Sequence, residues 1–241
     1  MAICDGEDGE GKMISPLYLG NLAKPKLIAL ALVPLSLALC YVFTFPFADT
    51  LSVKHCSLKD LSKIQRSNIR IAARALDGVV IKPGEEFSFN RSVGPRSDGR
   101  GYRAAPSYLE KDSPPTLGGG ICLLSSALYQ SALESGCAVT DRTAHTRTIR
   151  SVAPGLDSTV WYGQVDLKFR NPYPAPVQIA TEWTPSQLKV KILGKKSETV
   201  ETGDLRTITS NRNRDEIVVE VVRKTAGQPQ FISRDHYLVS H

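Results

Sequence analysis

The chain has 241 residues, of which 41% are hydrophobic and 22% are charged, and its formal net charge is +6. This length allows a sizeable buried core, and the composition is that of a globular protein. The charge excess is mild, and the sequence has no zinc-finger spacing, no aromatic-basic RNA signature and no internal repeat, so we expect no nucleic-acid partner.

The cysteines indicate neither a metal site nor a disulfide framework. Their number is odd, and their spacings match no metal-binding motif, so we expect no metal and no cofactor. We expect the cysteines of the body to be plain thiols, or to form at most one bridge, between Cys56 and Cys137. The five cysteines are Cys4, Cys40, Cys56, Cys122 and Cys137.

The most N-terminal feature is an uncharged run of 22 residues, 27–48. At about 1.5 Å rise per residue, a helix of this length spans a hydrocarbon core of roughly 30 Å. Lys24 and Lys26 precede the run, and the positive-inside tendency then keeps residues 1–26 in the cytoplasm. The sequence therefore predicts a single-pass protein of the cell membrane, with its body on the extracytoplasmic side.

Two variants of this segment remain open, and the start of the chain has an alternative. Cleavage after Ala48 would make the run a signal peptide, although Pro46 fits the cleavage pattern poorly. Cys40 would be a lipoprotein site, but Leu39 is larger than the small residue expected before such a cysteine. Met13 is an alternative start that would leave a more basic N-terminal segment.

The first part of the body predicts a helix and two strands. Residues 58–76 have the apolar spacing of an amphipathic helix, whose basic stripe is either a solvated face or a surface for anionic lipid or polymer. Residues 79–81 are typical of a strand, and a turn at Pro83-Gly84 leads into a second strand with Phe87 and Phe89.

The stretch "GGGICLLSSALYQSALESG", residues 118–136, predicts a helix that begins near Cys122 and stops at Gly136. An apolar stripe at helical spacing supports this interpretation. Its members are Ile121, Leu124, Leu128 and Ala132.

The remainder of the chain is rich in β-branched and aromatic residues. Pro154-Gly155 is interpreted as the turn of a hairpin, 188–193 and 216–224 as strands, and 231–239 as the closing strand of a second hairpin. No strand–helix–strand alternation runs through the chain, so we expect an α+β protein.

The predicted architecture is an N-terminal transmembrane helix and then a mixed domain, in which the cysteine-bearing helix packs on an antiparallel sheet. We place this domain at 50–195, and a small β-rich tail at 196–241.

Cys122 is the candidate nucleophile. A helix N-terminus carries partial positive charge and unpaired N–H groups, which stabilise a thiolate. Glycines before it allow close approach of a substrate, so we assign Gly118, Gly119, Gly120 and Ser125 to substrate binding. The alternative is that Cys122 is a small buried residue beneath a tight turn.

A thiol nucleophile needs a base and an orienting group, and His145 is the histidine best placed to be that base. If the hairpin turns near Gly155, His145 lies across from Asp166, which would orient the ring, while Asp157 lies nearer the turn. We therefore assign Cys122, His145, Asp166 and Asp157 as catalytic candidates, in an order of helix and strands that resembles transglutaminase-like and papain-like folds.

Three stretches together resemble the VanW family, named for an accessory protein of inducible vancomycin resistance in bacteria. They begin at "NIRIAARALDGVV", at "GGGICLLSSALYQ" and at "DSTVWYGQVDLKFRN", and the resemblance covers about residues 68–181. It implies an exported, membrane-tethered protein of the cell envelope. Cys122, His145, Asp157 and Asp166 all match family positions, but Leu123 stands where the family usually has glutamine.

Three functions follow from these observations. The first is a cysteine-dependent amide hydrolase or acyl transferase that acts on peptidoglycan peptides. The second is a non-catalytic module that binds a cell-wall peptide or fragment in the same glycine-rich cleft. The third is a scaffold at the membrane surface that organises other envelope proteins.

Overall fold

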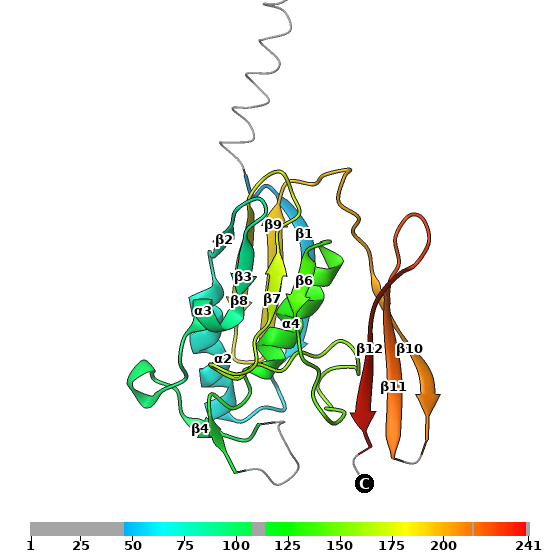
Figure 1. Ribbon diagram of the computed structural model, residues 1–241. Helices are drawn as coiled ribbons and strands as arrows, with labels where there is room; N and C mark the ends of the chain where they lie inside the picture. Colours follow the sequence, from blue (N-terminus) through cyan, green and yellow to red (C-terminus); the bar gives the residue numbers. More distant parts are fainter. Residues whose placement is uncertain (1–45, 108–113, 214, 240–241) are drawn as a thin grey trace, which may run out of the picture. The chain divides into compact units, whose positions relative to one another are not determined.

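The computed structural model describes residues 46–107, 114–213 and 215–239 (Figure 1). Across these residues, twelve strands accompany three α-helices and one short 3₁₀ turn. The protein is therefore mostly β-sheet, and the α+β class predicted from the sequence is wrong. Part of the difference comes from strands that the sequence pattern did not reveal, such as β1 (Asp49–Ser57), whose apolar residues do not alternate cleanly.

The fold-class prediction also needs correction at the N-terminus. The predicted transmembrane segment, 27–48, lies outside the described residues except for its last three, as do the alternative sites at Cys40 and Met13. In the described parts of the chain, no helix is long and apolar enough to cross a membrane. The described chain instead begins with a turn and enters β1 directly.

The largest sheet is antiparallel and buries one of its faces. Along β9, Leu188, Val190 and Ile192 are fully buried and alternate with the partly exposed Lys189 and Lys191. This period of two is that of a strand with one face on the core. The strand order is β1-β9-β8-β2, with β2 at Val80–Ile81, β8 at Val177–Trp183 and β9 at Gln187–Gly194.

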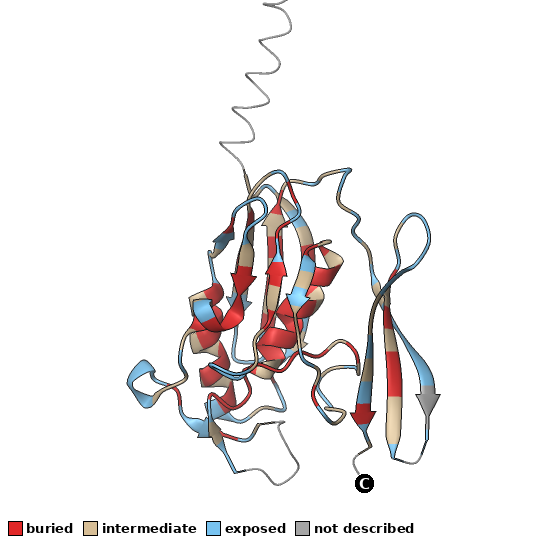
Figure 2. Cartoon of the chain, in the orientation of Figure 1, coloured by how far each residue is buried: buried red, intermediate tan, exposed pale blue. Residues whose placement is uncertain are grey.

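Two helices pack on the core. α2 (Lys63–Leu76) packs against β8, and α4 (Cys122–Glu134) packs against β1 and β9. α2 begins later than the predicted residue 58, because Ser62 and Gln65 form a reciprocal capping box there. Figure 2 shows that buried residues make up most of α4, which is covered on several sides.

A second, smaller sheet has the order β3-β7-β6 and carries a short helix. The rings of Phe87 and Phe169 meet in it with centroids 4.7 Å apart. The predicted strand with Phe87 and Phe89 is confirmed only as far as Ser88, because the Ser88 hydroxyl accepts the Arg91 N–H and a helix begins at Phe89. The elements are β3 (Glu86–Ser88), α3 (Phe89–Val93), β6 (Ala138–Asp141) and β7 (Lys168–Arg170).

Short elements fill the connection between α3 and α4. They are a 3₁₀ turn (Asp98–Arg100) and the paired strands β4 (Ala104–Ala105) and β5 (Thr116–Leu117).

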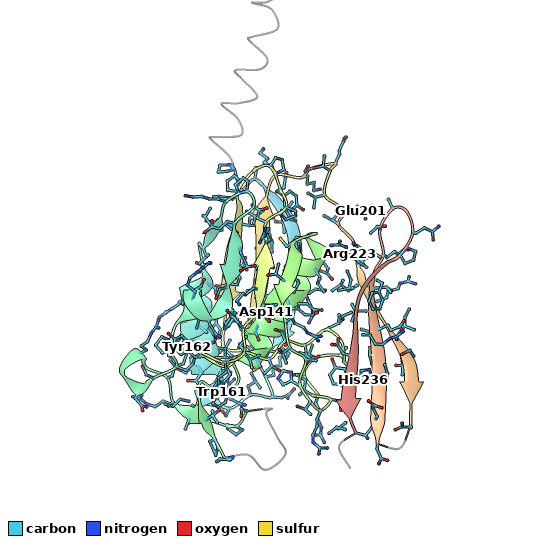
Figure 3. All side chains as sticks on the ribbon, viewed as in Figure 1. Asp141, Trp161, Tyr162, Glu201, Arg223 and His236 are labelled. Carbon is cyan, nitrogen blue, oxygen red and sulfur yellow. The ribbon has the colours of Figure 1, made fainter. Side chains whose placement is uncertain are left out.

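The C-terminal part forms a separate antiparallel sheet, β10-β11-β12. It joins the rest of the protein at two ends: Arg223 Nη1 donates to Leu133 O at 2.7 Å, and Leu238 N–H donates to Thr146 O at 2.9 Å. Arg223, labelled in Figure 3, thereby supplies a hydrogen bond to a carbonyl in the last turn of α4. The strands are β10 (Leu205–Arg212), β11 (Glu216–Arg223) and β12 (Gln230–Leu238).

Candidate functional site

All three glycines of the turn before α4 stand where a larger residue would be strained, and Gly118 has φ of +82°. Gly120 has φ of +99°, in the left-handed region that favours glycine. Gly119 lies outside this region, but a Cβ there would stand 2.1 Å from Ala105 O. This tight entry places Cys122 at the first residue of α4.

The start of α4 presents a backbone donor beside the thiol. The N–H groups of Leu123 and Leu124 bond to Gly120 O and Ile121 O at 3.1 and 2.9 Å, whereas the Cys122 N–H makes no such bond within the described chain. Leu123, at the position where the family usually has glutamine, points into the core and is 3% exposed. The donor at the site is therefore the Cys122 backbone rather than the next side chain.

Ser125 is not in the cavity. It is fully buried, and its hydroxyl donates to Ser158 O at 2.6 Å. The next hydroxyl, of Ser126, donates to Cys122 O at 2.6 Å and accepts the Ser158 N–H at 2.9 Å. The two serines thus fasten the first turn of α4 to the segment that precedes Val160.

A cavity of about 430 Å³ opens at Cys122. Its rim includes the partly exposed aromatic residues Trp161 and Tyr162, which lie together at one end of the body (Figure 3). The lining is mostly apolar side chain and glycine backbone, as is common for ligand sites. The lining residues are Pro95, Arg96, Ser107, Thr116, Leu117, Gly118, Gly119, Gly120, Ile121, Cys122, Val160, Trp161 and Tyr162.

The orienting partner of His145 is Asp157, not Asp166. His145 Nδ1 lies 2.6 Å from Asp157 Oδ2, and the His145 backbone N–H donates to the same oxygen at 2.7 Å. The segments cross at a bridge between Thr143 and Thr159, a register that sets residue 145 opposite 157. The predicted hairpin was centred on Gly155, whereas the observed register centres the crossing about four residues earlier in the sequence.

Asp157 is held from several sides. It is 1% exposed, and its Oδ1 accepts hydrogen bonds from Tyr237 Oη at 2.6 Å and Arg142 Nη2 at 3.2 Å. Burial alone raises the pKa of Asp157, but the hydrogen bond from His145 and the charge of Arg142 outweigh it, and the pKa is lowered. The carboxylate is therefore ionised and fixed in orientation at neutral pH.

His145 also interacts with Cys122. Burial alone lowers the pKa of His145, but the hydrogen bonds to Asp157 and to Cys122 raise it to about 9. The ring is thus held between a carboxylate on its Nδ1 side and the thiol, with Cys122 half-buried at the cavity. In a cysteine-dependent enzyme, a nucleophile, a base and an orienting acid would follow one another in this order.

Asp166 serves another element. Its Oδ2 accepts the Ser88 hydroxyl at 2.6 Å, and its Oδ1 accepts the backbone N–H of Asn90 at 2.8 Å. These are the first residues of α3, where a carboxylate compensates unpaired backbone donors. Asp166 therefore fastens α3, and the structure does not bring it to His145.

The sequence model of one protein family, described as "VanW like protein", matches residues 64–193. This is more than half of the chain. The chain belongs to the VanW family. Cys122, His145 and Asp157 all lie within the matched segment of this VanW family member, together with the cavity.

Two curated relatives agree with this assignment. The chain is 35% identical over 145 residues to the uncharacterized protein YoaR of Bacillus subtilis, covering 56% of this chain and 48% of YoaR. It is 31% identical over 117 residues to the vancomycin B-type resistance protein VanW of Enterococcus faecalis, covering 46% and 42%. The chain thus spans about half the length of the curated relatives that it matches. No solved structure is significantly similar.

Sequence reasoning missed two residues of this VanW-type site. Arg142 and Tyr237 both contact Asp157, but Tyr237 comes 80 residues later and lies beyond the segment that the family model matches. Local patterns carry no signal for such a contact. Among the described residues, no group of three or more His, Cys, Asp or Glu side chains is placed to hold a metal ion.

Proposed function

We propose that this VanW family member is a cysteine-dependent amide hydrolase or acyl transferase that acts on peptides of the cell envelope, on the extracytoplasmic side. The observation that carries the proposal is the position of His145 between Asp157 and Cys122, the last of which lines a cavity. The name of the Enterococcus faecalis relative, a vancomycin B-type resistance protein, supports a setting in the cell envelope.

In the first step, Cys122 Sγ attacks the carbonyl carbon of the amide and a C–S bond forms, with the proton of the thiol already held by His145, whose pKa of about 9 keeps the ring protonated at neutral pH. The amide C–N bond then breaks, and His145 returns the proton to the leaving amine. The Cys122 N–H, at the positive end of α4, is the donor available for the oxyanion. The product of this step is a thioester on Cys122 and a free amine.

In the second step, His145 removes a proton from water or from an acceptor amine, which attacks the thioester. Hydrolysis gives an acid, and acyl transfer gives a new amide; in both cases the C–S bond breaks and the starting Cys122–His145 pair is restored, with the proton on His145. Asp157 keeps the imidazole oriented through both steps without itself moving a proton.

The thiol itself is tested by alkylation of the full chain with iodoacetamide, followed by mass spectrometry at each cysteine. Burial raises the pKa of Cys56 and of Cys137 to about 11, so both are protonated near neutral pH. Cys122 should therefore alkylate first at pH 7, and His145→Gln should slow it by about tenfold. If Cys122 reacts only after denaturation, the thiol is packing and the cavity serves binding alone.

The reaction is tested on peptides released from purified peptidoglycan. Wild-type protein should change their masses, by one water for hydrolysis or by a joined acceptor for transfer, whereas Cys122→Ser should leave them unchanged. Cys137→Ser is the matched control, because Cys137 is a buried thiol outside the cavity. Peptides that bind with unchanged masses would favour the non-catalytic binding module over the enzyme.

A further inference from the structure

Among the described residues that line the cavity, Arg96 is the one with a charged side chain. It follows α3 in the sequence and lines the same cavity as Cys122. Gly118 gives it room, because a Cβ on Gly118 would stand 2.7 Å from Arg96 Cγ. The side chain and the glycine turn are therefore packed as one surface beside the thiol.

The guanidinium is held in place by neutral groups. Arg96 Nη1 donates to Asn90 Oδ1 at 2.8 Å and to Gly94 O at 2.9 Å. The guanidinium carbon lies 5.5 Å from the centre of the Phe89 ring and 5.8 Å from that of Tyr162. These contacts fix its direction, but they bring no negative charge.

Within the described chain, Arg96 forms no ion pair with a carboxylate, and its Nη2 is buried without a hydrogen-bond partner. The nearby carboxylate of Asp166 is occupied by Ser88 and by the start of α3. Burial lowers the pKa of Arg96, while Tyr102, Cys122 and Asp166 act in the opposite direction. A fixed cation of this kind is costly unless an anion compensates it.

A second buried donor without a hydrogen-bond partner among the described residues, the hydroxyl of Tyr102, interacts with Arg96. Tyr102 is fully buried, and its interaction with Arg96 is electrostatic. Tyr102 does not line the cavity, so the donor available to a ligand is Arg96, and a cation beside an apolar cavity matches the needs of a carboxylate attached to a hydrocarbon group.

We propose that Arg96 binds a carboxylate of the ligand in the Cys122 cavity, so that the ligand is a short peptide with a free carboxylate close to the amide that faces the thiol. The apolar part of the lining, which includes Leu117 and Val160, contacts the hydrocarbon group next to that carboxylate. This inference deepens the proposed function and rests on it for the reacting amide, but carboxylate binding does not require the thiol to react.

The first test compares two alkylating probes of nearly equal size, anionic iodoacetate and neutral iodoacetamide, at Cys122 of the full chain. The ratio of their rates should favour iodoacetate in the wild type and fall by about three- to tenfold in Arg96→Gln, since attraction across a few ångströms of partly screened medium has this size. Arg103→Gln, which removes a charge outside the cavity, should keep the wild-type ratio. An unchanged ratio in Arg96→Gln would overturn the inference.

The second test does not depend on thiol reactivity. Binding of N-acetyl-Ala-Ala, of its C-terminal amide and of N-acetyl-Glu amide is measured by calorimetry on the Cys122→Ser chain. The acid should bind about tenfold more tightly than its amide. Tighter binding of the glutamate probe would identify a side-chain carboxylate as the source.

Adding Arg96→Gln to this chain should abolish the preference, and Arg96→Lys should keep part of it. Equal affinities for all three probes in the parent chain would refute the Arg96 assignment, whether or not Cys122 proves reactive. Failure of Cys122 to alkylate, with the carboxylate preference intact, would instead count against the proposed enzyme alone.

Discussion

The Tyr237 hydroxyl donates a hydrogen bond of 2.6 Å to Asp157 Oδ1, from the last strand of the chain to the acid that orients His145. The same hydroxyl accepts the Gly155 N–H at 2.5 Å. One buried hydroxyl therefore fixes both the carboxylate and the loop that carries it. Because β12 lies beyond residue 193, the site draws on a part of the protein that the family model does not match.

Tyr237→Phe should remove both hydrogen bonds and leave the ring packing in place. We expect a loss of about 1–2 kcal/mol in the free energy of unfolding, since a buried donor and acceptor lose their partner. We also expect Cys122 to alkylate several-fold more slowly at pH 7, because the imidazole is less well oriented. Urea unfolding and rates of iodoacetamide labelling measure the two effects.

Tyr173→Phe is the matched control. The Tyr173 hydroxyl is also buried and donates to Ser135 O at 2.6 Å, away from Asp157. Its loss should cost a similar amount of stability and leave the alkylation rate of Cys122 unchanged. If both variants slow alkylation equally, Tyr237 acts only through general stability.

Elements with strong periodicity were predictable from the sequence. The helix after the glycines, the alternation around Leu188 to Leu193, and the two strands of the last hairpin all lie within one or two residues of their predicted places. Weakly patterned strands such as β1 were not, because their neighbours in the sheet, rather than their own sequence, stabilise them. That is why the helical share was overestimated.

The site was predictable only where a local sequence pattern marks its residues. Cys122 follows from the glycines and the helix, and His145 from the need for a base. Asp157 was placed too far away because Pro154-Gly155 was read as the centre of a hairpin, although the bridge at Thr143 and Thr159 centres the crossing earlier. Arg96 and Tyr237 act through contacts that local sequence patterns do not encode.

The glycine turn gives a further prediction. Gly119→Ala should destabilise the protein by about 1–3 kcal/mol, because the new Cβ would stand 2.1 Å from Ala105 O and the backbone must shift. Gly99→Ala is the control, since a Cβ there meets nothing within 4 Å. It should change the free energy of unfolding by no more than about 0.5 kcal/mol. Equal unfolding midpoints in urea for the two variants would show that the turn tolerates a side chain.

The pKa of His145 predicts how stability depends on pH. It rises from its ordinary value of 6.5 to about 9 in the folded protein, so the folded state binds a proton more tightly than the unfolded state. The resulting stabilisation, about 3 kcal/mol, is complete below pH 6.5 and is lost as the pH rises through 9. Urea unfolding between pH 6 and 10 should show this decline in the wild type.

The comparison with His145→Gln isolates this contribution, because groups that do not contact His145 titrate equally in both proteins. The difference in unfolding free energy between wild type and variant should shrink as the pH rises from 6.5 to above 9. A difference that is constant over this range would mean that folding does not raise the pKa of His145.

The last prediction separates the two aspartates. Asp157→Asn replaces a carboxylate 2.6 Å from His145 Nδ1 with a neutral amide, so the ring loses its ionic partner and its preferred orientation. Alkylation of Cys122 at pH 7 should slow by about tenfold. Asp166→Asn instead disturbs the contacts to Ser88 and Asn90 at the start of α3, and should lower stability while changing the alkylation rate less than about twofold. Mass spectrometry of labelled Cys122 in the two variants measures the rates. A larger effect from Asp166→Asn than from Asp157→Asn would restore Asp166 as the orienting residue, against the geometry of the folded chain.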